Sequence, residues 1–219
     1  MRILILLSLI LLSENCFAKY NYNSQCRQAY AKIFSLHFIS AQKIINAEKN
    51  KDPQNLVPIL LENNIDFYRA FIGEREVDFE IFEKNADDRL AIINDLGDKD
   101  SPYHRFAKAE IILHSAFLNA KFKNFLTAAW AVRKSYKLLE KNAELYPDFP
   151  LTYKNLGFLH AALGSVPDKY RWLVKTVGMD GQINQGVLEL RKAIKISESN
   201  ENYKVFKPEI LSVLLSVLQ

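Results

Sequence analysis

Histidines are the residues of this chain best suited to metal binding or proton transfer, because imidazole titrates near neutral pH and ligates metals. No two histidines are four residues apart, and the sequence has no His-Glu-x-x-His motif. A zinc site on one helix is therefore not expected. The four positions are His37, His104, His114 and His160.

Two of these histidines have a predicted structural role. Glu110 precedes His114 by four residues, so on a helix the two share a face. We expect an ion pair or hydrogen bond there, not half of a metal site. His160 lies one helical turn from glycines on either side, and we expect a packed or hydrogen-bonded residue, not a catalyst.

The sequence contains no acidic or nucleophilic motif that would form a metal site or a catalytic centre. Asp95, Asp98 and Asp100 surround Gly97, but they lack the order and the closing Glu of a calcium loop, so we interpret them as helix-end and turn residues. The chain contains no Gly-x-Ser-x-Gly elbow, phosphate loop or dinucleotide fingerprint. We therefore expect no enzyme activity, no metal and no cofactor.

Composition indicates an ordinary globular protein. The chain has 219 residues, of which 49% are hydrophobic and 25% charged, so disordered and low-complexity classes are excluded. Its net charge is only +4, because acidic and basic residues nearly balance, so a nucleic-acid-binding groove is not indicated. Charge alone therefore predicts no class of partner.

Residues 1–18 have the pattern of a secretory signal peptide. A charged start is followed by Ile3 to Leu12, of which only one residue is polar. As a helix this segment is about 15 Å long, half of a ~30 Å bilayer core, so a membrane-spanning helix is the weaker interpretation. Cleavage after Ala18 predicts a mature chain from Lys19, exported to the periplasm or outer membrane. A leader kept as an anchor is the alternative.

The two cysteines add little chemistry. Cys16 raises the alternative of a bacterial lipoprotein, but the charged and amide residues before it, Glu14 and Asn15, argue against one. Cleavage after Ala18 leaves Cys26 as the single mature cysteine, which cannot form an intramolecular disulfide. We expect Cys26 to be a small buried residue on a helix.

Apolar residues recur every three or four positions along the mature chain, which predicts helices. We expect one helix from Ser24 to about Asn50, paired as a hairpin with a helix over 56–72. Ser101 and Pro102 are expected to open a later helix as its N-cap and first residue. Since no segment alternates as a strand does, we predict an all-α chain of about nine helices. The others are expected near 77–96, 102–111, 122–143, 153–163, 168–177, 183–194 and 208–218.

Repeated offsets favour helical hairpins stacked as a solenoid. A small residue is followed at +4 by a larger apolar one and at +12 by proline, first at Ala41 and again at Ser135. These are the offsets of the second helix in a tetratricopeptide unit. Between Gly157 and Gly186, which match small positions of a first and a second repeat helix, the chain is roughly 17 residues too long.

The insertion contains most of the glycines. Five of seven fall within 30 residues, so we expect turns and close backbone contacts there. We predict a structural motif of glycines and a proline around a short helix at 168–177. Its members are Gly157, Gly164, Pro167, Gly178, Gly181 and Gly186.

The segment from Asn155 to Ala193 resembles one in secreted tetratricopeptide-like proteins of Bacteroidetes. It is similar, more loosely, to a Pro...Gly-x-x-Gly...Gly segment of eukaryotic tetratricopeptide proteins linked to inclusion-body clearance. The likeness covers about 40 of the 219 residues. It implies a repeat scaffold, with no enzyme activity to carry over.

These observations predict a signal peptide at 1–18 and a helical repeat domain at 19–219, with a modified repeat at about 150–197. We expect an exported scaffold that binds a protein or peptide in the cell envelope on a concave groove. In the insert, Tyr170, Arg171 and Trp172 are candidates for an aromatic and basic surface that binds a peptide or membrane headgroups. The alternative is that the insert packs onto its own repeat. A carrier of an apolar small molecule and a truncated piece of a longer repeat protein are the alternatives.

Overall fold

The computed structural model describes residues 19–219, and the predicted signal peptide and Cys16 lie outside the described residues. Every regular element in the described range is helical, which confirms the predicted all-α class. The α-helices are α2 (Ser24–Phe34), α3 (Phe38–Lys51), α4 (Val57–Gly73), α5 (Glu76–Leu96), α6 (Pro102–Lys121), α7 (Phe125–Leu145), α8 (Pro150–Gly164), α9 (Arg171–Thr176), α10 (Ile183–Ser199) and α11 (Lys207–Leu218). Two short 3₁₀ helices, η2 (Asp168–Tyr170) and η3 (Lys204–Phe206), precede α9 and α11.

The prediction of one helix over residues 24–50 is wrong. Helix α2 ends at Phe34, and Leu36 takes a left-handed φ of 60° before α3 begins at Phe38. A left-handed residue ends a right-handed helix, yet both helices bury their apolar faces in the same core, so the apolar stripe continues across the break. The first hairpin is therefore α2–α3.

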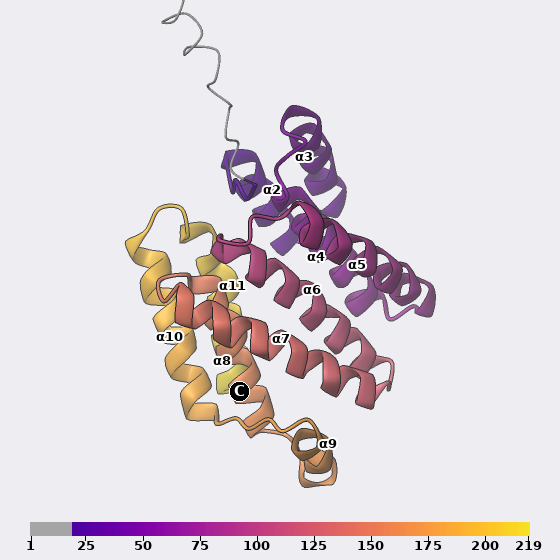
Figure 1. The fold of residues 1–219 in the computed structure, drawn as a ribbon, viewed down its shortest axis with the longest axis vertical. Coiled ribbons are helices and arrows are strands. Elements are labelled where there is room, and N and C mark those ends of the chain that lie inside the picture. The colour runs from indigo at the N-terminus through magenta and orange to yellow at the C-terminus, as the bar shows by residue number, and fades with distance from the viewer. Residues whose placement is uncertain (1–18) are drawn as a thin grey trace, which may run out of the picture.

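Successive helices form antiparallel pairs, α2–α3, α4–α5, α6–α7 and α8–α10, which follow one another through the molecule (Figure 1). The first helix of a pair also contacts the first helix of the next: α4 packs on α2 and α6, and α8 packs on α6 and α11. This order of contacts is compatible with solenoid stacking.

Small residues at the predicted positions allow close helix contacts. Ala41 is fully buried in α3, and the hydroxyl of Ser135 in α7 donates to the carbonyl oxygen of Ala109 in α6 at 2.8 Å. A Cβ on Gly186 would lie 2.3 Å from the carbonyl oxygen of Gly157. Helices α8 and α10 therefore cross with their backbones in contact, as predicted from the two glycines.

The two ends of the described chain meet in an aromatic cluster. The ring of Phe206 in η3 lies 4.9 Å from Tyr22 and 5.0 Å from Tyr30 of α2, both in edge-to-face geometry. Edge-to-face pairs add stability beyond their buried area. Segments almost 180 residues apart in the sequence thus share one core.

Residues 19–219 include no helix with both the length and the apolar composition that a membrane span requires.

Candidate binding sites

The insert connects α8 to α10 and projects from the end of that pair (Figure 1). It contains η2 and α9, so the predicted short helix exists but begins as a 3₁₀ turn. Leu173 and Val177 anchor the insert, with 9% and 2% of their surface exposed. The segment is therefore held by two apolar side chains on one side.

The structure places Tyr170, Arg171 and Trp172 on the insert with different surroundings. The Tyr170 ring packs against Phe125 of α7 at 5.6 Å. The guanidinium of Arg171 pairs with Asp168 at 2.8 Å, and both side chains are exposed. Trp172 is 57% exposed, as its irregular segment suggested. The three residues thus share a segment but not a single enclosed site.

Steric constraints explain why the insert has glycine at several positions. Gly178 adopts a φ of +61°, a left-handed conformation that side chains with a Cβ disfavour. A Cβ on Gly181 would lie 2.6 Å from the His160 carbonyl oxygen, and one on Gly164 would lie 2.9 Å from the Ile183 nitrogen. Pro167 is the N-cap of η2. The predicted motif therefore shapes the turns on both sides of α9.

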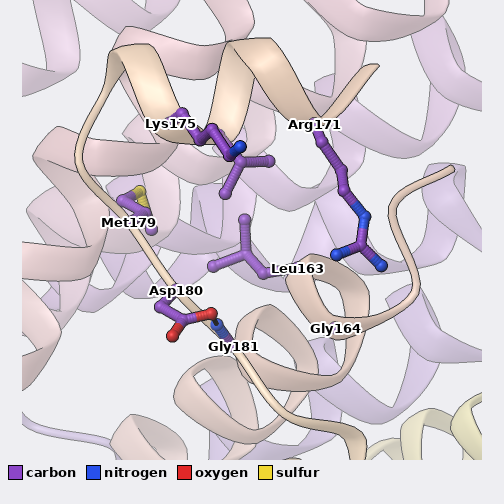
Figure 2. Close-up of a pocket in the computed structure, with 8 residues that line it drawn as sticks. Leu163, Gly164, Arg171, Lys175, Met179, Asp180 and Gly181 are labelled. Atoms are coloured by element: carbon purple, nitrogen blue, oxygen red, sulfur yellow. Dashed lines mark hydrogen bonds between the residues drawn. The ribbon is translucent and has the colours of Figure 1, made fainter. Parts of the chain in front are cut away.

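A cavity of about 350 Å³ lies under α9 (Figure 2). Figure 2 shows Arg171 and Lys175 extending from α9 on either side of Leu163, with Asp180 opposite them in the loop that follows α9. One carboxylate among two cations suits a small anionic group better than a cation. No group of three His, Cys, Asp or Glu side chains suited to a metal ion occurs within 19–219.

A second hollow, which we call the α5–α7 groove, has a volume of about 290 Å³ and is lined by residues of α5, α6 and α7. Its apolar lining includes Ile111 and Ile112 of α6 and Leu90 of α5. Trp130 of α7 forms one wall and is 50% exposed. A half-exposed tryptophan beside an apolar floor is the type of residue that dominates binding energy at protein interfaces.

Charges of opposite sign line the two walls of this groove. Glu83 and Asp87 belong to α5, whereas Lys134 belongs to α7. The Ser115 hydroxyl donates to Glu83 at 2.6 Å, which fixes that carboxylate at the floor. Sequence reasoning missed this groove, although Trp130 stands outside the apolar stripe of its helix and gave a signal.

A buried ionic network joins α6, α8 and α11. Lys154 Nζ lies 3.0 Å from Glu110 Oε1 and 2.9 Å from Glu209 Oε1. Tyr30 donates to the other oxygen of Glu209, and Asn155 donates to the other oxygen of Glu110. Burial raises the pKa of Glu209 to about 8. Sequence reasoning missed this network too, although Lys154 is the one charged residue of α8.

The chain itself covers this network. Lys154 and Glu110 are 4% exposed, because α11 packs on α8 and places Glu209 against them. The α5–α7 groove lies away from this packing.

His160 has the hydrogen-bonded role that the sequence predicts, whereas His114 and Glu110 share a face without the predicted ion pair or hydrogen bond. The Nδ1 atom of His160 lies 2.6 Å from Glu189, and its Nε2 atom lies 2.9 Å from the Tyr136 hydroxyl. His114 Nε2 lies 3.8 Å from Glu110 Oε1. Burial lowers the pKa of His114 to about 4, so it is neutral at pH 7.

Comparison with models of known protein families, with curated proteins and with solved structures gives no match for this chain.

Proposed function

We propose that the protein is an exported, tetratricopeptide-like scaffold without catalytic activity, which binds a peptide segment of an envelope protein in the α5–α7 groove. The observation that carries the proposal is the position of Trp130, half-exposed beside the apolar side chains of Ile111 and Leu90. Burying that exposed indole area against an apolar peptide residue would supply the largest part of the binding free energy.

The surroundings of Trp130 support a pre-formed site. Ile111 is fully buried and Ile112 is 6% exposed, so the floor is fixed by the core of the α6–α7 pair. A floor that does not rearrange lowers the conformational entropy lost on binding. Ser115 and Glu83 are already hydrogen bonded to each other, which leaves Asp87 and Lys134 as the charged groups available to an incoming chain.

The charges on the walls indicate the chemistry of the peptide. A basic residue next to the apolar anchor would face Asp87, and an acidic residue on its other side would face Lys134. Such pairs at the rim add orientation and selectivity more than affinity. The proposed ligand is therefore an extended or helical segment with an apolar anchor between residues of opposite charge.

The alternative of an apolar small-molecule carrier has less support. Its aromatic side chains would have to enclose a cavity, but large rings pack on one another, as Phe79 does on Phe122 at 4.7 Å and Phe67 on His114 at 3.9 Å. The hollows lined by α5–α7 and by the insert are open to solvent at their mouths.

The test is selection of peptides from a random library on the immobilised protein, followed by affinity measurement on variants. Trp130→Ala should weaken the best peptide at least about tenfold, which corresponds to ~1.4 kcal/mol. Trp172→Ala is the matched control, because it removes an equally exposed tryptophan from the insert. Selected peptides that bind Trp130→Ala as well as the wild type would contradict the proposal.

A further inference from the structure

The turns between the two helices of each pair form one continuous edge of the molecule, which we call the turn edge. It consists of residues 35–39, 69–78, 121–126 and the insert at 165–178. Antiparallel pairs that stack side by side must bring these turns to the same edge, and the three later turns follow one another along one side in Figure 1.

Contacts join each turn to the next. Arg69 of the second turn lies over the Phe38 ring of the first at 5.9 Å. Lys121 of the third turn pairs with Glu74 of the second at 2.7 Å. Phe125 of the third turn packs on Tyr170 of the insert, as described above. The turn edge is thus a single surface.

Large apolar side chains are exposed all along this edge. Eight of them have between 39% and 74% of their surface exposed. They are Leu36, Ile39, Phe71, Ile72, Val77, Phe125, Leu126 and Trp172. The opposite edge, formed by residues 49–56, 95–105, 144–150 and 198–207, exposes two such residues, Leu96 and Leu145.

The two edges also differ in charge. The turn edge contains seven basic and four acidic residues, a net charge of +3, whereas the opposite edge contains six basic and eight acidic residues, a net charge of −2. Three of the four acidic residues of the turn edge form ion pairs with Lys121, Arg75 and Arg171. The excess positive charge therefore stands beside the exposed apolar side chains.

We propose that the turn edge docks on the surface of a membrane that contains anionic lipids. Apolar and aromatic side chains at the tips of turns can enter the boundary between headgroups and acyl chains, while lysines and arginines beside them contact phosphates. The apolar residues are spread over four turns, without a shared groove along the whole edge. This arrangement fits a flat, deformable lipid surface better than a shaped protein surface.

Membrane docking goes beyond peptide binding and uses different residues. Trp130, Leu90 and Asp87 of the α5–α7 groove lie outside the four segments of the turn edge. A protein docked in this way would hold its groove beside the membrane. Variants can therefore separate the two activities.

The test is co-sedimentation of the purified protein with vesicles of phosphatidylglycerol and phosphatidylcholine, and with vesicles of phosphatidylcholine alone. We expect binding to the anionic vesicles that falls with added salt. The triple variant Ile39→Ser, Ile72→Ser, Leu126→Ser should bind at least about tenfold more weakly. The matched control is Leu96→Ser, Leu145→Ser, Leu188→Ser, three leucines of similar exposure outside the turn edge, which should bind as the wild type does.

A charge variant gives a second readout. Lys123→Glu with Lys175→Glu should lower binding to anionic vesicles, and Lys51→Glu with Lys204→Glu on the opposite edge should not. All four lysines belong to exposed positions, and circular dichroism checks that each variant is folded. Absence of vesicle binding, or an equal loss of binding in the test and control variants, would overturn the proposal of membrane docking. The affinity of the triple variant for the selected peptide should stay unchanged, so a failure of membrane docking can be told apart from a failure of peptide binding in the α5–α7 groove.

Discussion

Lys154 in α8 lies 2.9 Å from Glu209 in α11, measured from Nζ to Oε1, and Glu209 also accepts a hydrogen bond from Tyr30 in α2. The last helix of the chain is thereby joined to both the first helix and the centre of the stack. Because Glu110 lies 3.0 Å from the same ammonium group, Lys154 contacts the carboxyl groups of both residues. This network makes stability depend on a few buried charges.

Lys154→Met should destabilise the protein strongly. The variant leaves the Glu110 carboxylate buried without its cation, a change that costs about 3–5 kcal/mol in other proteins. The measurement is urea unfolding followed by circular dichroism. Lys141→Met is the control, since Lys141 pairs with Glu144 on the surface and both side chains are more than half exposed. The free energy of unfolding of Lys141→Met should stay within about 0.5 kcal/mol of the wild-type value. Equal effects of the two substitutions would contradict the role of the network.

The contribution of Glu209 to stability should fall as pH rises from about 4.5 to about 8. Burial raises the pKa of Glu209 from 4.5 to about 8, so the folded state holds a proton that the unfolded state has lost. That stabilisation is complete below pH 4.5 and is lost as pH passes through 8. Glu110 faces the same site, but Lys154 lowers its pKa.

The measurement for this effect is the difference in unfolding free energy between wild type and Glu209→Gln across pH 4 to 9. Glutamine keeps the shape and cannot ionise, so the variant should gain relative stability as the wild type loses it. Curves that stay parallel over the whole range would show that Glu209 does not titrate in this way.

Gly186→Ala should destabilise the α8–α10 pair. The added Cβ would lie 2.3 Å from the Gly157 carbonyl oxygen and 2.8 Å from the Ala161 nitrogen, so the helices must move apart. Overpacking of this kind costs about 1–3 kcal/mol. Gly73→Ala is the control, because the nearest atom to its Cβ, in Asp78, is 3.4 Å away. The melting temperature of Gly186→Ala should drop while that of Gly73→Ala stays near the wild-type value.

Export should remove residues 1–18. Cleavage after Ala18 predicts that the protein recovered from the envelope fraction starts at Lys19. Intact mass spectrometry measures this start directly. A mass that includes the leader, found in the cytoplasmic fraction, would contradict export.

Periodic apolar residues predicted most helices because their burial in one core is a local pattern, repeated every turn. The break after Phe34 was not predicted, since the left-handed residue that follows it, Leu36, is of a type that does not signal a turn. The crossing of Gly157 and Gly186 was predicted, because small residues at matched offsets have few other uses.

The binding surfaces were harder to predict. The insert was found from its glycines, and its irregular sequence pointed to exposure of Trp172, with packing onto its own repeat as the alternative. The α5–α7 groove and the network around Lys154 depend on side chains that meet from helices far apart in the sequence. A local sequence pattern does not show contacts between distant helices. Each site nevertheless contains one residue that is unusual for its helix, Trp130 in the groove and Lys154 in the network.

Hydrogen–deuterium exchange with and without a selected peptide tests the proposed binding site most directly. The account predicts slower exchange in residues 83–90 of α5 and 127–134 of α7 when peptide is bound, because both segments line the groove around Trp130. Protection confined to the insert at 165–178, with no change in α5 and α7, would contradict it.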